Sequence, residues 1–197
     1  GGGGGSGGSV QLLAAHLSGG GTLSAQGGAG GFVTAGGGGG GRIAIYTTSG
    51  AENIVTRTEP GCEAASSGCG SSHAGAGTTY WHITKTLIVD AEGKSNTLAT
   101  PLTDEAFDNM IIQGEGRLST DIPVTLGETL HVANSGYLEG LSEVPLSITV
   151  PELLVEGSVQ SLSSGGPSTL SIDASTSVSI SPGGTLRCNG ATCEITL

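Results

Sequence analysis

The chain has 197 residues, of which 38 are glycine, so glycine makes up about a fifth of it against a usual share of roughly 7%. Aromatic residues are 3% and charged residues 12%, which leaves too few large side chains for an ordinary globular core. The net charge is −11 and the six Lys and Arg residues are scattered singly, which excludes a nucleic-acid-binding surface of clustered cations. No apolar run approaches the ~20 residues of a membrane span, and an anionic membrane surface is equally disfavoured by the charge.

Short stretches that alternate between apolar and polar residues predict strands, and no sustained period of 3.6 residues predicts a helix. These stretches are rich in Val, Ile, Leu, Thr and Ser, which suit a pleated surface, and Gly, Asn, Asp and Pro separate them. In chain order, examples of the predicted strands are Val10–Leu12, Arg42–Tyr46, Leu146–Val150, Leu170–Ile172 and Val178–Ile180.

A short element, glycine followed by any residue and then an aliphatic residue, recurs along the chain. The matches are residues 8–10, 21–23, 41–43, 116–118, 136–138, 157–159 and 184–186. In the second half they follow one another at roughly 20 residues or slightly more, with the last interval the widest, and the elements ending at Leu23 and Ile43 have the same spacing. Such spacing predicts an all-β fold, a right-handed parallel β-helix (solenoid) whose coils stack on one another. At each corner we expect glycine to supply a positive φ and the aliphatic residue to point inward. The alternative fold is a β-sandwich.

We predict two domains on this basis. Residues 1–102 form a glycine-rich module with a Cys-bridged insertion, and residues 103–197 form β-helical coils of about 20 residues each. Residues 194–197 have the composition of a strand cut within a coil, so we expect the coils to continue beyond the chain end.

The glycine tracts have three interpretations. Residues 1–8 have the composition of a linker, but the longer run Gly36–Gly41 lies inside the chain, where no linker is expected. That run is either a flexible surface loop or a set of extended polyglycine segments that pack side by side and hydrogen-bond through the backbone. The packed arrangement would require few aromatic residues, as observed.

The four cysteines form two closely spaced pairs, Cys62 with Cys69 and Cys188 with Cys193. Turn residues lie between the members of each pair, and neither spacing is usual for a zinc site. We therefore predict two local disulfides and an oxidising compartment. The alternative is four free thiols in a reducing cell.

Three strings of the first half resemble a glycine-rich repeat module of very large secreted proteins. They are SerGlyGlySerVal at 6–10, LeuSerGlyGlyGlyThrLeuSerAla at 17–25 and the more specific GlyGlyGlyGlyGlyGlyArgIleAlaIleTyr at 36–46. Residues 75–81 and ThrLeuIleValAsp at 86–90 resemble the part that closes such a module, so the resemblance covers residues 1–102. The resemblance implies tandem arrays on cell surfaces, as adhesins, sheath components or mastigoneme-like filaments, and it supplies no catalytic motif.

Candidate chemistry is sparse in this sequence, and we predict no catalytic, cofactor-binding or metal-ligating residue and no cofactor. The densest acidic group is Asp104, Glu105 and Asp108, which suits a solvated turn better than a weak calcium site. His82 beside Tyr80 and Trp81 is better explained by packing than by ligand binding. The remaining candidates are dispersed: His16, His73 and His131, with Asp121 and Glu139 as the acids that stacked coils would bring nearest Arg117.

Three functions follow from these observations. The favoured one is an extracellular, cell-surface structural repeat in a fibre or coat, with copies of itself or neighbouring repeats as partners and no enzymatic activity. The alternative is an adhesin module that binds a glycan or a surface, which an aromatic groove near Tyr80–His82 would favour. The least favoured is a polysaccharide-acting β-helix enzyme, which would need converging carboxylates or a carboxylate facing Arg117 in a cleft.

Overall fold

The computed structural model describes residues 2–31, 35–50, 53–62, 74–95, 98–103, 106–141, 145–162, 168–189 and 193–196, the last of these for the backbone alone. Every regular element in these ranges is a β-strand, so the predicted all-β class is confirmed. Within these ranges no helix is long and apolar enough to cross a membrane.

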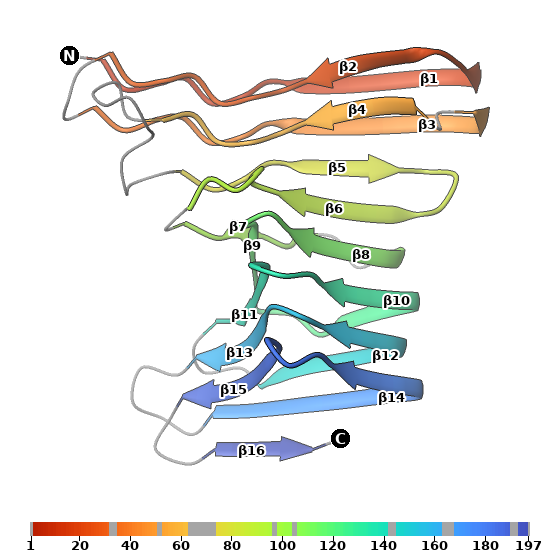
Figure 1. Ribbon diagram of the computed structural model, residues 1–197, viewed down its shortest axis with the longest axis vertical. Helices are drawn as coiled ribbons and strands as arrows, with labels where there is room; N and C mark the ends of the chain where they lie inside the picture. Colours follow the sequence, from red (N-terminus) through yellow and green to blue (C-terminus); the bar gives the residue numbers. More distant parts are fainter. Residues whose placement is uncertain are drawn as a thin grey trace.

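The main sheet runs along the long axis of the molecule and has nine strands (Figure 1). In spatial order they are β1 (Ser9–Leu17), β3 (Arg42–Gly50), β5 (Thr78–Trp81), β6 (Thr86–Asp90), β8 (Phe107–Gln113), β10 (Val124–Val132), β12 (Leu146–Val155), β14 (Ser168–Ile180) and β16 (Cys193–Thr196). All neighbours pair in parallel except β5 and β6, which form an antiparallel hairpin. This pairing differs from that of an immunoglobulin-type sandwich, whose sheets are antiparallel.

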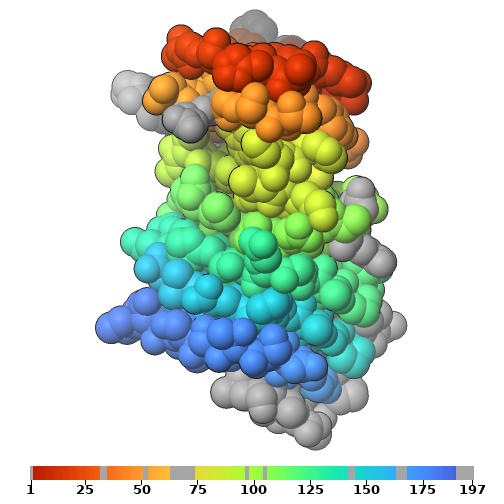
Figure 2. Space-filling model, turned by 90° about the vertical axis from the view of Figure 1, so that its right-hand side faces the viewer, coloured from red at the N-terminus to blue at the C-terminus, as the bar shows by residue number. Residues whose placement is uncertain are grey.

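Two smaller sheets lie alongside the main one. The five-stranded sheet has the order β15 (Thr185–Asn189), β13 (Ser158–Leu162), β11 (Tyr137–Gly140), β9 (Arg117–Thr120) and β7 (Thr100–Pro101), and all its pairings are parallel. The two-stranded sheet pairs β2 (Gly20–Ser24) with β4 (Asn53–Arg57), also in parallel. Apart from the β5–β6 hairpin, the chain alternates between a strand of the main sheet and a strand of a smaller sheet, and successive turns stack in order from one end to the other (Figure 2).

The glycine–x–aliphatic elements of the second half stack as predicted. Their aliphatic residues stand in register on adjacent strands: Leu118 pairs with Leu138, Leu138 with Val159, and Val159 with Leu186. Leu118, Leu138 and Val159 are fully buried. These elements therefore mark successive turns of one stack.

The role predicted for the corner glycines is wrong in its mechanism. Their φ angles are not positive, and the left-handed backbone lies one residue earlier in two turns, at Glu115 (φ 67°) and Ser135 (φ 63°). The glycines are instead required by close approach. A Cβ at Gly136 would lie 2.2 Å from the carbonyl oxygen of Ile112, and one at Gly184 would lie 2.1 Å from that of Val155.

The first half repeats every 33 residues, a period that sequence analysis missed. Strand β1 pairs with β3 from Ser9↔Arg42 onward, and β2 pairs with β4 from Gly20↔Asn53 onward, both at this offset. The spacing between Leu23 and Ile43 is consequently coincidental, because Leu23 lies in β2 and pairs with Thr56.

Two hydrophobic clusters occupy opposite faces of the main sheet. The smaller one contains Ala25, Ile43 and Ile45, with Val10, Leu12, Leu17, Leu23 and Trp81 packed against it. The larger one begins at Ala76 and continues through the interior of the second half, with Leu87 and Val89 at the hairpin. Across the hairpin, Trp81 stands opposite Thr86, whereas Leu87 stands opposite Tyr80. Residues that pair across a sheet share a face, so the buried face changes between β5 and β6.

The main sheet itself continues across the predicted domain boundary at residues 102 and 103. Strand β6, before the boundary, pairs with β8, after it, over five residue pairs from Thr86↔Asn109 to Asp90↔Gln113. The change of buried face at the β5–β6 hairpin is therefore the main internal division of the sheet.

Candidate functional site

Five extended segments of the first half pack side by side: residues 2–8, 25–31, 35–41, 58–62 and 74–77, of which all but 58–62 are rich in glycine. Their backbone hydrogen bonds recur every three residues. The central segment, residues 35–41, donates to residues 25–31: Gly38 N–H to Gly28 O (2.9 Å) and Gly41 N–H to Ala25 O (2.7 Å). The central segment also accepts from residues 2–8: Gly4 N–H donates to Gly36 O (2.9 Å) and Gly7 N–H to Gly39 O (2.8 Å). A period of three is typical of polyproline II geometry, which forms no hydrogen bonds within its own chain.

The segments approach so closely that half or more of the glycines have no room for a side chain. A Cβ on Gly37, Gly38 or Gly40 would lie 2.1, 2.0 or 1.8 Å from a backbone oxygen of a neighbouring segment. Gly36, by contrast, faces open space, and Gly39 has its nearest neighbour at 3.6 Å. The tract Gly36–Gly41 is thus the centre of a packed glycine layer, and the flexible surface loop was the wrong alternative.

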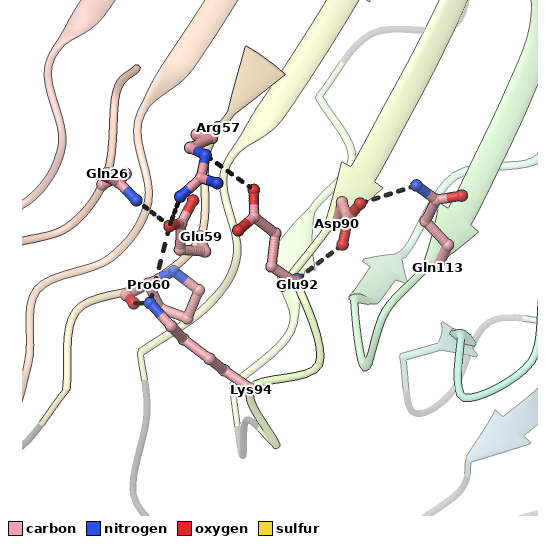
Figure 3. A network of polar contacts seen from close by, with 8 residues as sticks. All are labelled: Gln26, Arg57, Glu59, Pro60, Asp90, Glu92, Lys94 and Gln113. Carbon is pink, nitrogen blue, oxygen red and sulfur yellow. Dashed lines mark hydrogen bonds and ion pairs between the residues drawn. The ribbon is translucent and has the colours of Figure 1, made fainter. Parts of the chain in front are cut away.

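A polar cluster ties this layer to the turn that follows β6 (Figure 3). The Glu59 side chain is only 3% exposed, and it accepts a hydrogen bond from the Gln26 amide. Two cations form ion pairs with its Oε1 atom at distances too long for hydrogen bonds, Arg57 Nη1 at 4.0 Å and Lys94 Nζ at 3.9 Å. Lys94 also donates to Pro60 O at 3.1 Å. Burying a carboxylate costs free energy unless it is paired. The contacts of Glu59 and Lys94 therefore hold the turn after β6 in position against the glycine layer.

Glu92 stands at the border of the same cluster, with its Oε1 3.9 Å from Arg57 Nε. Burial raises the pKa of this carboxyl above its ordinary value of 4.5, and the nearby Glu59 and Asp90 carboxylates raise it further, against the lowering effect of Arg57 and Lys94. The folded chain therefore holds this proton more tightly than the unfolded chain. The resulting stabilisation is complete below the ordinary pKa and is lost as the pH rises through the raised value.

Glu92→Gln is expected to remove this pH dependence. Relative to wild type, the variant should gain stability as the pH is raised from below 4.5 to neutrality, because the glutamine is never ionised. Urea unfolding followed by the fluorescence of Trp81, the only tryptophan, would measure the difference at each pH. A constant stability difference between the two proteins across this range would contradict the prediction.

A groove opens where the buried face of the main sheet changes. It has a volume of about 570 Å³, and its floor is the sheet face that carries Arg42 and Tyr46 of β3, Thr78 and Tyr80 of β5 and Phe107 of β8. The opposite wall is the segment Thr100–Thr103. In the second half this sheet face is covered by the five-stranded sheet, but that cover ends at β7. The groove is therefore the open end of the larger hydrophobic interior.

Aromatic rings form a continuous row along this groove. The ring centroids of Tyr46 and Tyr80 are 6.0 Å apart, and those of Tyr80 and Phe107 are 5.8 Å apart. His82 extends the row, with its ring centroid 5.2 Å from that of Tyr46. These distances lie in the range for favourable edge-to-face or tilted pairs. His82 is exposed and contacts Tyr46, while the rings of Tyr46, Tyr80 and Phe107 line the groove.

The remaining predicted residues are dispersed. Cys62 and Cys188 lie among the described residues and neither is a free thiol, whereas Cys69 and the side chain of Cys193 lie outside them, so the two pairings stay predictions. Asp104, Glu105 and His73 also lie outside the described residues. Three of the other predicted residues have a side-chain partner: Lys85 binds Asp108 at 3.1 Å, Ser49 binds His16 at 3.0 Å and Glu156 binds His131 at 3.2 Å.

Arg117 contacts Glu139, as the stacking of coils predicts, while Asp121 is not part of this contact. The guanidinium also lies 5.4 Å from the ring centroid of Tyr137, and Gln160 donates to the same Glu139 carboxylate at 2.9 Å. These side chains come from β9, β11 and β13, so the ion pair and the Gln160 hydrogen bond together link three adjacent strands. The described residues contain no cluster of three or more potential metal ligands.

Comparison with protein-family models, with curated proteins and with solved structures gave no match.

Sequence analysis missed Glu59 and Arg42 as site residues. A signal for Glu59 exists in the 33-residue period, which aligns it with Gln26, its partner in the structure. Arg42 stands out in the sequence only as one of the scattered cations, although it directly follows the glycine run that brings it to the groove.

Proposed function

We propose that this chain is an extracellular structural repeat module of a large cell-surface or filament-forming protein, built as a β-solenoid. The observation that supports this most directly is the ladder of strands, which runs along the long axis with one main-sheet strand per turn (Figure 1). Turns of this kind bury their apolar faces only against neighbouring turns, so stability accumulates along the stack. The non-free cysteines Cys62 and Cys188 are compatible with an oxidising, extracellular setting.

The exposed edges of the ladder are suited to end-to-end association. Strand β1 is an edge of the main sheet, and its Leu13 side chain is 70% exposed. In the adjoining glycine segment, Gly2, Gly5 and Gly8 face open space. An exposed edge strand pairs readily with another strand. Its partner would be another copy of the chain or a neighbouring repeat of the same protein, continuing the translation that relates β3 to β1.

Lysines on the outer edge should prevent this association. The double substitution Gln11→Lys and Leu13→Lys is expected to abolish concentration-dependent, end-to-end oligomers, since charged side chains block edge pairing. Sedimentation velocity and negative-stain electron microscopy would measure assembly. A matched control, Thr125→Lys with Thr149→Lys, places the same added charge on exposed positions of paired interior strands β10 and β12. Wild-type chains that remain monomeric at high concentration, or control chains that lose assembly equally, would contradict the proposal.

The groove described above supports a second candidate, an adhesin module that binds a glycan. Its row of aromatic rings lies where such a site was expected, near Tyr80–His82. A structural module and a binding module are compatible on one chain, because the groove lies on a side of the stack and the association edge lies at its end.

A further inference from the structure

The groove is longer than a single hollow. A second hollow of about 270 Å³ adjoins the first, lined by Gly39–Gly41 of the glycine layer, by Gly75–Gly77 and by Leu98. The two hollows share Arg42, Thr78, Thr100 and Pro101. Together they form an elongated surface that runs from the aromatic row past Arg42 to the glycine layer. An elongated, open groove suits a linear polymer better than a small compact molecule.

The chemistry of the lining is mixed in a way that suits a sugar chain. The half-buried rings of Tyr46 and Tyr80 offer apolar faces with negative π-density, against which the C–H groups of a sugar ring can pack. Hydroxyl groups of Thr78 and Thr103 and the backbone of the glycine segment supply hydrogen-bonding groups beside them. A few polar groups on a largely apolar lining are typical of ligand sites.

A cation at the junction of the two hollows points to an anionic ligand. Arg42 lies where the hollows meet, is exposed and makes no ion pair within the described part of the chain. Arg57, Lys85, Lys94 and Arg117, in contrast, each lie within 4.0 Å of a carboxylate. A guanidinium matches the planar geometry of a carboxylate and binds it through two parallel hydrogen bonds.

We infer that this groove binds a linear acidic polysaccharide, with a uronate carboxylate on Arg42 and adjacent sugar rings on Tyr46 and Tyr80. This binding rests on the second candidate function, a glycan-binding module, and needs no assembly, since the residues that carry it belong to one chain.

Isothermal titration calorimetry of the full chain would test the inference. The probes are an oligogalacturonate long enough to span both hollows and the same oligomer with its carboxylates reduced to alcohols. Arg42→Gln should weaken binding of the oligogalacturonate by about tenfold or more, because a charge-assisted contact is lost. The same variant should bind the reduced oligomer as wild type does. Tyr46→Ala should weaken binding of both oligomers.

The control is Arg187→Gln, which removes the same charge from a distant position on β15 and should leave oligogalacturonate binding unchanged. The inference is overturned if wild type binds neither oligomer, if Arg42→Gln binds like wild type, or if Arg187→Gln loses as much affinity. Arg42 is exposed, so its variant should fold normally, which circular dichroism would check. Monomeric chains suffice, so this test is independent of the assembly experiment.

Discussion

Gly38→Ala is expected to lower the free energy of unfolding by about 3 kcal/mol or more, which is at the upper end for an overpacked site. The added Cβ would lie 2.0 Å from the carbonyl oxygen of Gly5 and 2.4 Å from its carbon. Both neighbours are backbone atoms, so no side chain can rotate away. The central segment would have to move off its neighbours and give up backbone hydrogen bonds such as the one from Gly38 to Gly28.

Gly36→Ala is the matched control, since it makes the same chemical change two residues earlier in the same tract. A Cβ there meets nothing within 4 Å and the backbone φ is not positive, so its effect should stay within about 0.5 kcal/mol. Urea unfolding would be followed by Trp81 fluorescence, because that ring packs against the hydrophobic cluster of the first half. Equal stabilities for the two variants would mean that the glycine layer is not close-packed.

Leu138→Ala should destabilise the second half by about 3 kcal/mol, a typical value for a leucine truncated inside a packed core. Leu138 is fully buried and stands in register between Leu118 on one side and Val159 on the other. Neither neighbour can fill the space without leaving its own position in the ladder. Far-UV circular dichroism during urea unfolding would measure the loss.

Leu141→Ala provides the comparison for this second prediction. It lies three residues further along the same turn and is 43% exposed, so its truncation should cost less than about 1 kcal/mol. If the two substitutions lowered the free energy of unfolding equally, the stacked glycine–x–aliphatic element would contribute no more to stability than an exposed position of the same turn.

The stacking of the second half could be predicted because one glycine–x–aliphatic element marks each of its turns. The elements ending at Leu118, Leu138, Val159 and Leu186 are separated by variable insertions, but each restores the same register. The reason for the glycine could not be predicted. A requirement for positive φ and a requirement for close approach select the same residue, and only the packing distinguishes them.

The repeat of the first half was harder to find, because a glycine run aligns with another glycine run at many offsets. The informative residues are the few apolar ones: Val10 and Leu12 align with Ile43 and Ile45 only at the offset that the strand pairing adopts. The sequence singled out Tyr80–His82 as the place where an aromatic groove would matter, but the groove itself could not be predicted. Its position depends on the antiparallel pairing of β5 with β6, which the sequence of the hairpin does not reveal.

The β5–β6 hairpin leaves the hand of the crossovers unchanged along the molecule. The hairpin reverses the direction of the strands, and at the same point the buried face of the main sheet changes sides. The hand of a crossover between parallel strands depends on strand direction, on the face that the crossover covers and on the direction of stacking. When direction and face reverse together, the hand is unchanged. The crossovers from β1 to β3 and from β8 to β10 therefore wind with the same hand, as the strong preference for one hand in such connections requires. Two repeats of different period are thus joined without a change in chirality.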